Sequence, residues 1–132
     1  MSQLYVDRLR DAYEAFDTGG VEAILDRVAP DLQVRGRASS PDRETLVGGE
    51  GIVELVRLNL EAFDSLELEP LEFIDRGEMI VIVLLQRVRG RASGVPLECE
   101  TVHVWDFRDG HAAQMRIFAD RARALEVLAQ EG

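Results

Sequence analysis

The chain has 132 residues, a formal net charge of −10 and 46% hydrophobic residues, so we expect one globular domain spanning residues 1–132. The negative charge argues against nucleic acid as a partner, because contacts to phosphate need a cationic surface, and it disfavours an anionic membrane face. No charged start leads into an apolar run, and no apolar run approaches the length of a bilayer span. We therefore expect a cytoplasmic protein.

Residue usage narrows the chemistry further. The sequence contains no lysine, which excludes a lysine Schiff base or a lysine general base. Cys99 is the single cysteine, so a disulfide within the chain and a multi-cysteine metal site are excluded. His103 and His111 are too few and wrongly spaced for a usual zinc motif. We expect no cofactor, and only magnesium bound by carboxylates alone stays open as a metal.

The first third of the chain predicts two helices and a short strand. Apolar residues recur at helical spacing over Ser2–Phe16, and Asp17–Gly20 suits a left-handed C-cap. Val21–Val28 repeats the spacing before a proline ends it. Leu32–Arg35 alternates with period two, which is typical of a strand.

The middle of the chain changes from helical to strand periodicity. Serine, proline and glycine over Gly36–Gly51 indicate a loop, and Gly51–Phe63 predicts a third helix with a wide apolar face. Leu66–Ile74 predicts a strand in which Pro70 marks a bulge or an edge. Met79–Leu85 is an uninterrupted, β-branched apolar run, so we expect this strand to be covered on both faces.

The last third predicts a long hairpin over residues 95–120. Arg108–Gly110 looks like a three-residue loop with a glycine bulge, which places His103 opposite Met115 and Trp105 opposite Ala113. A two-residue loop would instead place His103 opposite Arg116, and both registers stay open.

A final helix is expected over Arg121–Ala129. Asp120 is its predicted N-cap, and Leu125 and Leu128 are expected to face inward. Helices early in the chain, followed by four strands that pair in sequence and a last helix, predict an α+β domain with a curved antiparallel sheet.

The chain resembles the SnoaL-like branch of the nuclear transport factor 2 (NTF2-like) superfamily. The segments that carry the resemblance are Ala15–Gly20, Ala29–Leu32, Gly48–Ile52, Val102–Trp105, Arg108–Gly110, Asp120–Ala122 and Ala124–Leu125. The resemblance implies a cone-shaped barrel, in which the curved sheet wraps around a pocket with three N-terminal helices and a C-terminal helix. Relatives include polyketide cyclases, ketosteroid isomerases and proteins without a catalytic role, so the fold alone does not name a reaction.

Comparison with the ketosteroid isomerase pattern shows which catalytic residues of that enzyme are absent from this chain. Gly36 stands where the resemblance places the aspartate base, and Ala12, not Tyr13, stands where it places the oxyanion-hole tyrosine. His103 takes the position of the protonated aspartate. Steroid isomerisation by that mechanism is therefore not expected. The SnoaL-type cyclases use a single acid/base, usually an aspartate, in an apolar cavity, and His103 would supply one here.

We predict His103 as the catalytic residue, because it titrates near neutrality and lies on the face of the hairpin that carries apolar bulk. The residues predicted to bind substrate are Tyr13, Asn59, Cys99, Thr101, Trp105, Phe107 and Met115. The alternative for each is a structural role, with His103 as a neutral ring that completes a packed core.

Two functions follow from these residues. The first is acid/base chemistry on an apolar, carbonyl-bearing small molecule through His103, as in a cyclase, isomerase or dehydratase. The second is a non-catalytic ligand-binding or dimerisation module. A homodimer through the outer sheet face is expected, because Val102, Val104 and half of Met79–Leu85 face away from the pocket and the helices are expected to cover only the inner face.

Overall fold

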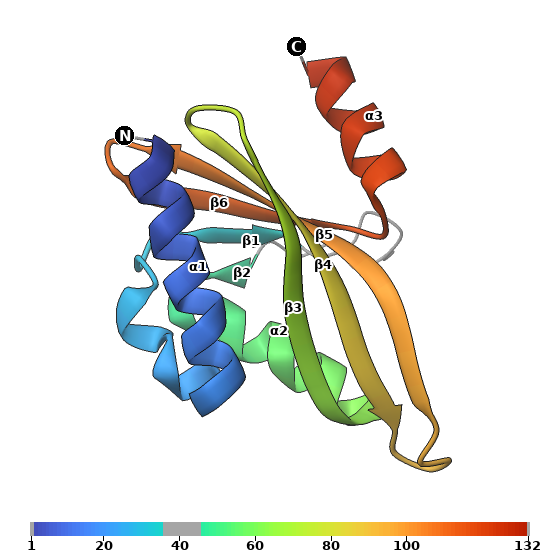
Figure 1. The fold of residues 1–132 in the computed structure, drawn as a ribbon. Coiled ribbons are helices and arrows are strands. Elements are labelled where there is room, and N and C mark those ends of the chain that lie inside the picture. The colour runs from blue at the N-terminus through green and yellow to red at the C-terminus, as the bar shows by residue number, and fades with distance from the viewer. Residues whose placement is uncertain (1, 36–45, 132) are drawn as a thin grey trace.

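The computed structural model describes residues 2–35 and 46–131. It is an α+β fold built around one six-stranded sheet (Figure 1). The elements in chain order are α1 (Ser2–Gly19), η1 (Val21–Ala23), η2 (Leu25–Arg27), β1 (Gln33–Arg35), β2 (Leu46–Val47), α2 (Gly48–Ala62), β3 (Phe63–Asp75), β4 (Met79–Gly90), β5 (Pro96–Arg108), β6 (His111–Phe118) and α3 (Arg121–Glu131). The predicted curved, cone-like α+β architecture is confirmed.

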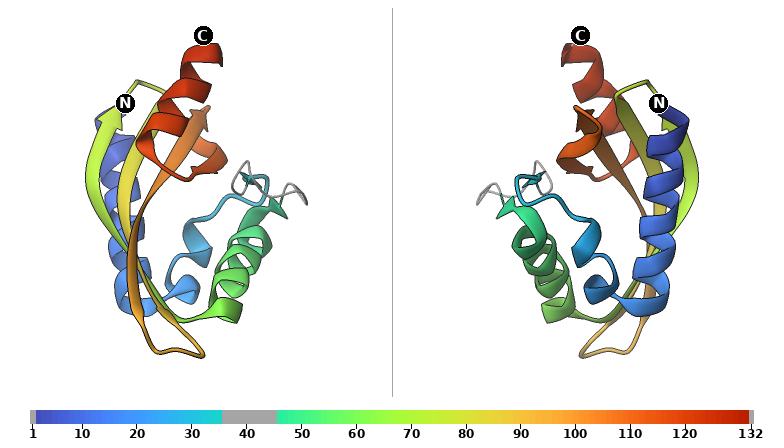
Figure 2. Two further views of the ribbon diagram at one scale, coloured as in Figure 1. Left: turned by 90° about the vertical axis from the view of Figure 1, so that its right-hand side faces the viewer. Right: turned by 90° about the vertical axis from the view of Figure 1, so that its left-hand side faces the viewer.

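The sheet is a four-stranded meander extended by two short strands. Its strand order is β2-β1-β6-β5-β4-β3, and only the β1–β6 pair is parallel. The strands bend strongly, with α1 and α3 on opposite sides of them and α2 across the concave side (Figure 2). In the part of the chain that the structure describes, no helix is long and apolar enough to cross a membrane.

Strand β4 is covered on both faces, as its apolar run predicts. Ile80, Ile82 and Leu84 pack on the inner side with residues of α1, whereas Val81 and Val83 pack on the outer side with residues of α3. Alternating side chains of one strand point to opposite faces, so a continuous apolar run requires a cover on each.

The outer cover is α3, which the sequence analysis did not foresee. Val102 and Val104 are fully buried against it, together with Phe118. The expectation that helices cover only one face is therefore wrong, and the argument for a homodimer loses its premise over this part of the sheet.

The N-cap of α3 is confirmed, but its inward face differs from the prediction. The Asp120 carboxylate accepts a hydrogen bond from the Arg123 backbone N–H at 2.8 Å. Ala124 and Leu128 are buried, whereas Leu125 is 43% exposed. The inward positions are thus spaced by four residues, as one helical face requires, and Leu125 lies beside that face.

Two predicted boundaries in the first half are wrong for local reasons. Residues 21–28 form two short 3₁₀ turns, Val21–Ala23 and Leu25–Arg27, and not one helix, and the chain turns extended at Val28 with ψ 122°. The glycine-rich segment before the third helix belongs partly to that helix, which begins at Gly48. Leu46–Val47, also within the predicted loop, form strand β2, and residues 36–45 lie outside the described residues.

Glycine is needed at that helix start for space. Gly48 adopts φ +66°, and a Cβ there would lie 2.9 Å from the Pro30 carbonyl oxygen. A Cβ on Gly51 would lie 2.9 Å from the Leu46 Cβ. The glycines therefore let α2 approach β2 and the entry to β1 closely, a role that composition alone does not distinguish from a loop.

The β5–β6 register differs from both predicted registers. Asp109 and Gly110 both have positive φ, 54° and 85°, which makes a two-residue turn, and Arg108 pairs with His111. A bulge beyond Phe107 then shifts the pairing by one residue, so His103 lies opposite Ile117 and Trp105 opposite Met115. No residue pattern in the sequence predicts the bulge beyond Phe107.

The bulge predicted at Pro70 is confirmed by a register shift between Pro70 and Glu72 in the edge strand β3.

Candidate active site

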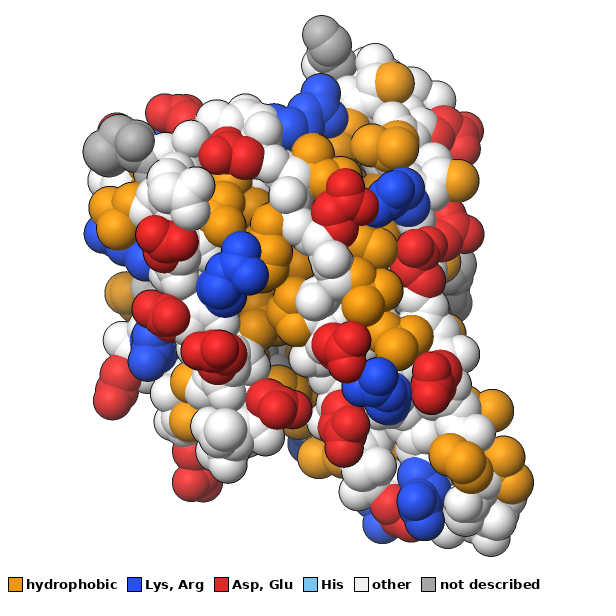
Figure 3. All heavy atoms as spheres, in the orientation of Figure 1, with side chains coloured by type: hydrophobic (Ala, Val, Ile, Leu, Met, Phe, Trp, Pro, Cys, Tyr) orange, Lys and Arg blue, Asp and Glu red, His pale blue; other side chains and the backbone are white. Residues whose placement is uncertain are grey.

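The concave side of the sheet encloses a cavity of about 990 Å³. Its walls come from α1, η2, α2 and the inner faces of β3 to β6. Apolar side chains gather between α1 and the neighbouring strands in the face shown in Figure 3, with acidic side chains around them. This size is at the upper end of the range that holds drug-sized ligands.

Helix α2 forms an apolar wall of the cavity, and several of its apolar side chains are not fully buried. Ile52 is buried, but Leu55, Val56 and Asn59 are only half-buried although they line the cavity. An apolar helix face that stands off the sheet leaves hydrophobic surface available to a ligand. The wide apolar face predicted for this helix therefore borders a cavity and not a closed core.

The polar centre of the cavity is a chain of three side chains. The Tyr13 hydroxyl oxygen lies 2.6 Å from His103 Nδ1, and Trp105 Nε1–H donates to the same oxygen at 3.0 Å. Tyr13 and His103 are 8% and 5% exposed, and all three residues line the cavity. The chain thus holds two titratable groups together within an apolar wall.

Burial determines the protonation of Tyr13. It raises the pKa of Tyr13 well above its ordinary value, and the hydrogen bond from Trp105 offsets this only in part. Tyr13 therefore stays a neutral phenol that carries one O–H. With a neutral His103 that carries its proton on Nε2, that O–H donates to Nδ1, while the tyrosine oxygen accepts the Trp105 N–H.

Local structure explains how these side chains meet. Tyr13 follows Leu9 by four residues on the inward face of α1, and both are buried. His103 and Trp105 are two residues apart on β5, so they share the concave face, with Ile82 opposite His103 on β4. Sequence periodicity predicts that the strand residues share a face, but the approach of Tyr13 to His103 depends on where α1 crosses the sheet.

The other predicted binding residues differ in what they offer a ligand. Met115 is buried, and Phe107 stacks on Tyr5 with ring centroids 4.0 Å apart, so both form wall. Asn59 lines the cavity, but its Nδ2 donates to the Leu55 carbonyl oxygen in its own helix. Cys99 lies exposed at one end of the cavity.

Thr101 is not brought into the cavity wall. Its side chain is fully buried, and the hydroxyl donates to the Phe118 carbonyl oxygen at 3.3 Å. The β5–β6 pairing starts at Val102 and Phe118, so Thr101 closes the end of that ladder. We assign it this structural role. Gly36, placed by the resemblance where a base would be, lies outside the described residues.

Sequence reasoning missed three charged or titratable residues at the cavity edge. Arg8, Arg27 and His111 line it and come from α1, η2 and the start of β6. They are far apart in the chain and share no motif, so only the fold brings them to one cavity. Among the described residues, no group of three or more His, Cys, Asp or Glu side chains could hold a metal ion.

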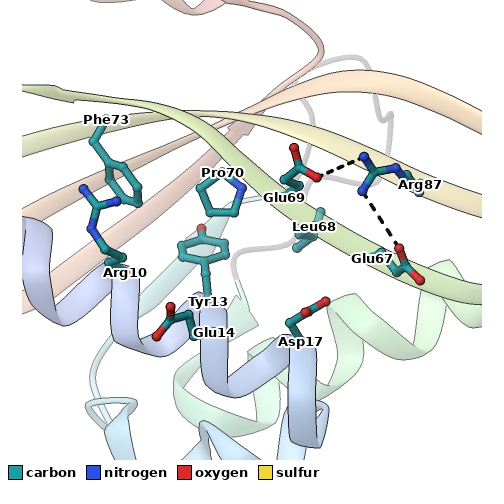
Figure 4. Close-up of a pocket in the computed structure, with 10 residues that line it drawn as sticks. All are labelled: Arg10, Tyr13, Glu14, Asp17, Glu67, Leu68, Glu69, Pro70, Phe73 and Arg87. Atoms are coloured by element: carbon teal, nitrogen blue, oxygen red, sulfur yellow. Dashed lines mark hydrogen bonds and ion pairs between the residues drawn. The ribbon is translucent and has the colours of Figure 1, made fainter.

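A second, smaller crevice of about 350 Å³ lies between α1 and the edge strand β3 (Figure 4). Tyr13 and Leu68 line both this crevice and the main cavity, so they form the partition between them. The crevice rim is charged: Arg87 binds Glu69 at 2.9 Å, and the Arg10 guanidinium lies 4.5 Å from the centre of the Phe73 ring. The larger, apolar cavity is therefore the better candidate for a ligand site.

Solved structures share this architecture along nearly the whole chain. An NTF2-like protein of unknown function from Burkholderia pseudomallei is 27% identical, with a TM-score of 0.73 and coverage of 92% of this chain and 94% of that one. TerC, crystallised with polyporic acid, is 24% identical, with a TM-score of 0.74 and coverage of 94% and 97%. A putative SnoaL-like polyketide cyclase from Jannaschia sp. CCS1 is 19% identical, with a TM-score of 0.69 and coverage of 96% and 88%.

Sequence comparison agrees with the structural likeness. No curated protein matches the sequence. The profile of the SnoaL-like domain family, however, matches residues 9–115, which include most of α1 and most of the cavity wall. The chain therefore belongs to the SnoaL-like domain family.

Proposed function

We propose that the cavity binds an apolar, carbonyl-bearing metabolite and that the Tyr13–His103 pair performs acid/base chemistry on its oxygen. The observation that carries this proposal is the buried contact of 2.6 Å between the tyrosine hydroxyl and His103 Nδ1 inside an apolar cavity. A titratable ring and a phenol held together in a water-poor site are suited to proton transfer.

The direction of the hydrogen bond gives the pair two states. When His103 is neutral, Tyr13 donates its proton to Nδ1, and the hydroxyl offers no proton to a ligand. When His103 gains a proton at Nδ1, this N–H donates to the tyrosine oxygen, whose second lone pair already accepts from Trp105. The tyrosine O–H must then turn away from both partners, toward the cavity.

This arrangement makes Tyr13 the acid that contacts substrate and His103 its proton source. As negative charge develops on a substrate oxygen, the tyrosine proton moves to it, and the His103 Nδ1 proton moves to the tyrosine oxygen. A free tyrosinate is never formed, which suits a phenol whose pKa is raised by burial. General acid catalysis of this kind contributes roughly 10²–10⁴-fold to a rate.

Two of the structural neighbours support a small organic ligand. TerC was crystallised with polyporic acid, and the Jannaschia protein is described as a putative polyketide cyclase. The same cone and coverage in this chain favour a related use of the cavity.

The proposal is tested by enolisation, in which a solvent base removes the α-proton while Tyr13 protonates the carbonyl oxygen; this test needs no knowledge of the natural substrate. An apolar ketone such as 2-tetralone is incubated with the protein in D₂O, and loss of its α-proton signal is followed by NMR. We expect exchange above the buffer rate in the wild type, and a loss of roughly 10²-fold or more in His103→Ala and Tyr13→Phe. His111→Ala is the matched control, because it removes the other histidine at the cavity edge. Equal exchange in the wild type and in His103→Ala would overturn the proposal.

A second candidate function is ligand binding without catalysis. It is favoured by the charge of the wall: among the described lining residues Glu98 is the only carboxylate, and it lies on β5 near the exposed end of the cavity. Tight binding of apolar carbonyl compounds, seen as a change in Trp105 fluorescence, together with no exchange above buffer, would select this function.

A further inference from the structure

The charges that line the cavity oppose the charge of the whole chain. The formal net charge of the protein is −10, yet the lining includes Arg8, Arg27 and His111 against the single carboxylate of Glu98. The cavity lining therefore carries more basic than acidic side chains, although the whole chain carries more acidic than basic ones.

Two contacts bring Arg8 and His111 to one end of the cavity. Arg8 Nη1 donates to the Gly110 carbonyl oxygen at 2.7 Å, which brings α1 to the β5–β6 turn. The next residue, His111, places its Nε2 3.8 Å from the Asp31 carboxylate. Arg27 lies on η2, four residues before Asp31. Glu98 lies on the opposite half of β5, ten residues before Arg108, which pairs with His111.

Arg27 is available to bind an anion. Its side chain is exposed at the cavity edge, and no carboxylate of the described residues forms an ion pair with it. The exposed Asp31 carboxylate lies loosely against His111 and offsets only part of the positive charge. A guanidinium presents two parallel N–H groups, which match the two oxygens of a carboxylate.

We propose that the ligand is an elongated apolar acid whose carboxylate binds at this end, against Arg27 with Arg8 and His111 around it. This inference rests on the proposed function and names its substrate class. The carbonyl of the same ligand would then reach the Tyr13–His103 pair farther along the cavity.

The spacing sets the length of the ligand. Arg8 precedes Tyr13 by five residues on α1, about 8 Å along the helix axis. His103 precedes Arg108, the partner of His111, by five residues on β5, about 17 Å along the strand. A ligand whose carboxylate and carbonyl are separated by one to three rings would span backbone separations of this size.

The test compares a carboxylate with its neutral isostere. Trp105 is the single tryptophan and lines the cavity, so its fluorescence reports occupancy. Biphenyl-4-carboxylate and biphenyl-4-carboxamide are titrated at low ionic strength. We expect the wild type to bind the carboxylate about 10-fold more tightly, since a charged hydrogen bond at a partly exposed site is worth on the order of 1–2 kcal/mol. The preference should shrink in high salt.

Two variants test whether Arg27 causes the preference for the carboxylate. Arg27→Gln should remove most of the preference by weakening only the carboxylate, with the carboxamide unchanged. Arg76→Gln, in the exposed β3–β4 turn, makes the same change in net charge away from the cavity and should retain the preference.

Each contrary outcome has a separate meaning. Equal affinities for carboxylate and carboxamide in the wild type would overturn this inference and leave the proposed function standing. A preference lost equally in both arginine variants would show a general charge effect and overturn the assignment to Arg27. Absence of any Trp105 response to either probe would overturn the inference and the binding step of the proposed function together.

Discussion

The Tyr13 hydroxyl is held between two groups that depend on it. Trp105 donates to it, and His103 Nδ1 shares its proton. Buried polar atoms that lose such a partner keep the full cost of their desolvation. Tyr13 therefore affects the stability of the fold as well as the chemistry proposed for the cavity.

Tyr13→Phe is expected to lower the free energy of unfolding by about 1–3 kcal/mol, because it leaves the Trp105 N–H and His103 Nδ1 without this partner. Denaturant unfolding followed by circular dichroism measures the loss. Tyr5→Phe is the matched control: Tyr5 is equally buried, but its ring stacks on Phe107 and no hydrogen bond joins its hydroxyl to a described residue. A cost as large in Tyr5→Phe as in Tyr13→Phe would contradict this account.

Alkaline pH gives a second test at the same residue. The pKa of Tyr13 is raised in the folded state, mainly by burial, whereas in the unfolded chain it returns to about 10. Above that pH the unfolded state releases the proton first, so stability is complete below pH ~10 and falls by about 1.4 kcal/mol per pH unit above it. Unfolding free energies measured from pH 8 to 11 should show this fall in the wild type and a shallower one in Tyr13→Phe.

Residue patterns predicted part of this site and missed part of it for a physical reason. Alternation along β5 correctly placed His103 and Trp105 on one face. The resemblance put Ala12 at the tyrosine position. In the structure Ala12 and Tyr13 both line the cavity, but Tyr13 supplies the hydroxyl that meets His103, because the crossing of α1 over the sheet and not the position in the sequence decides this contact.

At the level of elements, α3 is the part that most changes the expected architecture. It buries the outer face of β4 and β5 with only two of its own core side chains, Ala124 and Leu128. The Glu100 carboxylate accepts the Arg121 backbone N–H at its start, and Glu131 binds Arg116 at its end. Both ends of the helix are thus anchored to the sheet.

Leu128→Ala is expected to destabilise the protein by about 2–4 kcal/mol, because it removes buried methyl groups and leaves a cavity against Phe118 and the valines. Leu125→Ala is the control on the same helix and should cost less than about 1 kcal/mol, since Leu125 is largely exposed. Thermal or denaturant unfolding compares the two variants. Equal costs would show that α3 does not pack on the sheet as described.

Element boundaries show where sequence patterns stop being informative. The strong periodicities of α1 and β4 located those elements well. The start of α2 was placed late because glycine disfavours helices, although here Gly48 begins the helix and is required by its close approach to the Pro30 carbonyl oxygen. The β5–β6 register was missed because it depends on a bulge near Phe107 that follows from packing and not from turn residues.

At the scale of the whole molecule, the outer surface divides into two regions. One region, around Val83 and Val102, is covered by α3. The other region carries an exposed ion network in which Arg87 lies near Glu67, Glu69 and Glu98, and this network extends to the crevice beside α1 and to the exposed end of the cavity. Such exposed pairs contribute little to stability.

The homodimer remains a prediction, but its interface would have to use other residues than the sequence analysis expected. A dimer through the outer face would have to use α3 itself or the ion network, because the valines are no longer available. Light scattering coupled to size exclusion decides the question, with 14.8 kDa expected for one chain and twice that for a dimer. Arg87→Glu would weaken a dimer that uses the ion network, and a single-chain mass at high protein concentration would rule the dimer out.

The parallel pairing of β1 with β6 has a consequence for how the protein folds. Gln33 pairs with Gln114, about 80 residues later, whereas β3 to β6 pair through short turns between neighbours in sequence. Closing a long loop costs more entropy than closing a hairpin, and the pairing of only three residues of β1 offsets this cost. The meander should therefore form first and β1 should dock last. Because β1 precedes α2 and leads into the cavity wall, the binding site would be the final part of the molecule to assemble and the first to open.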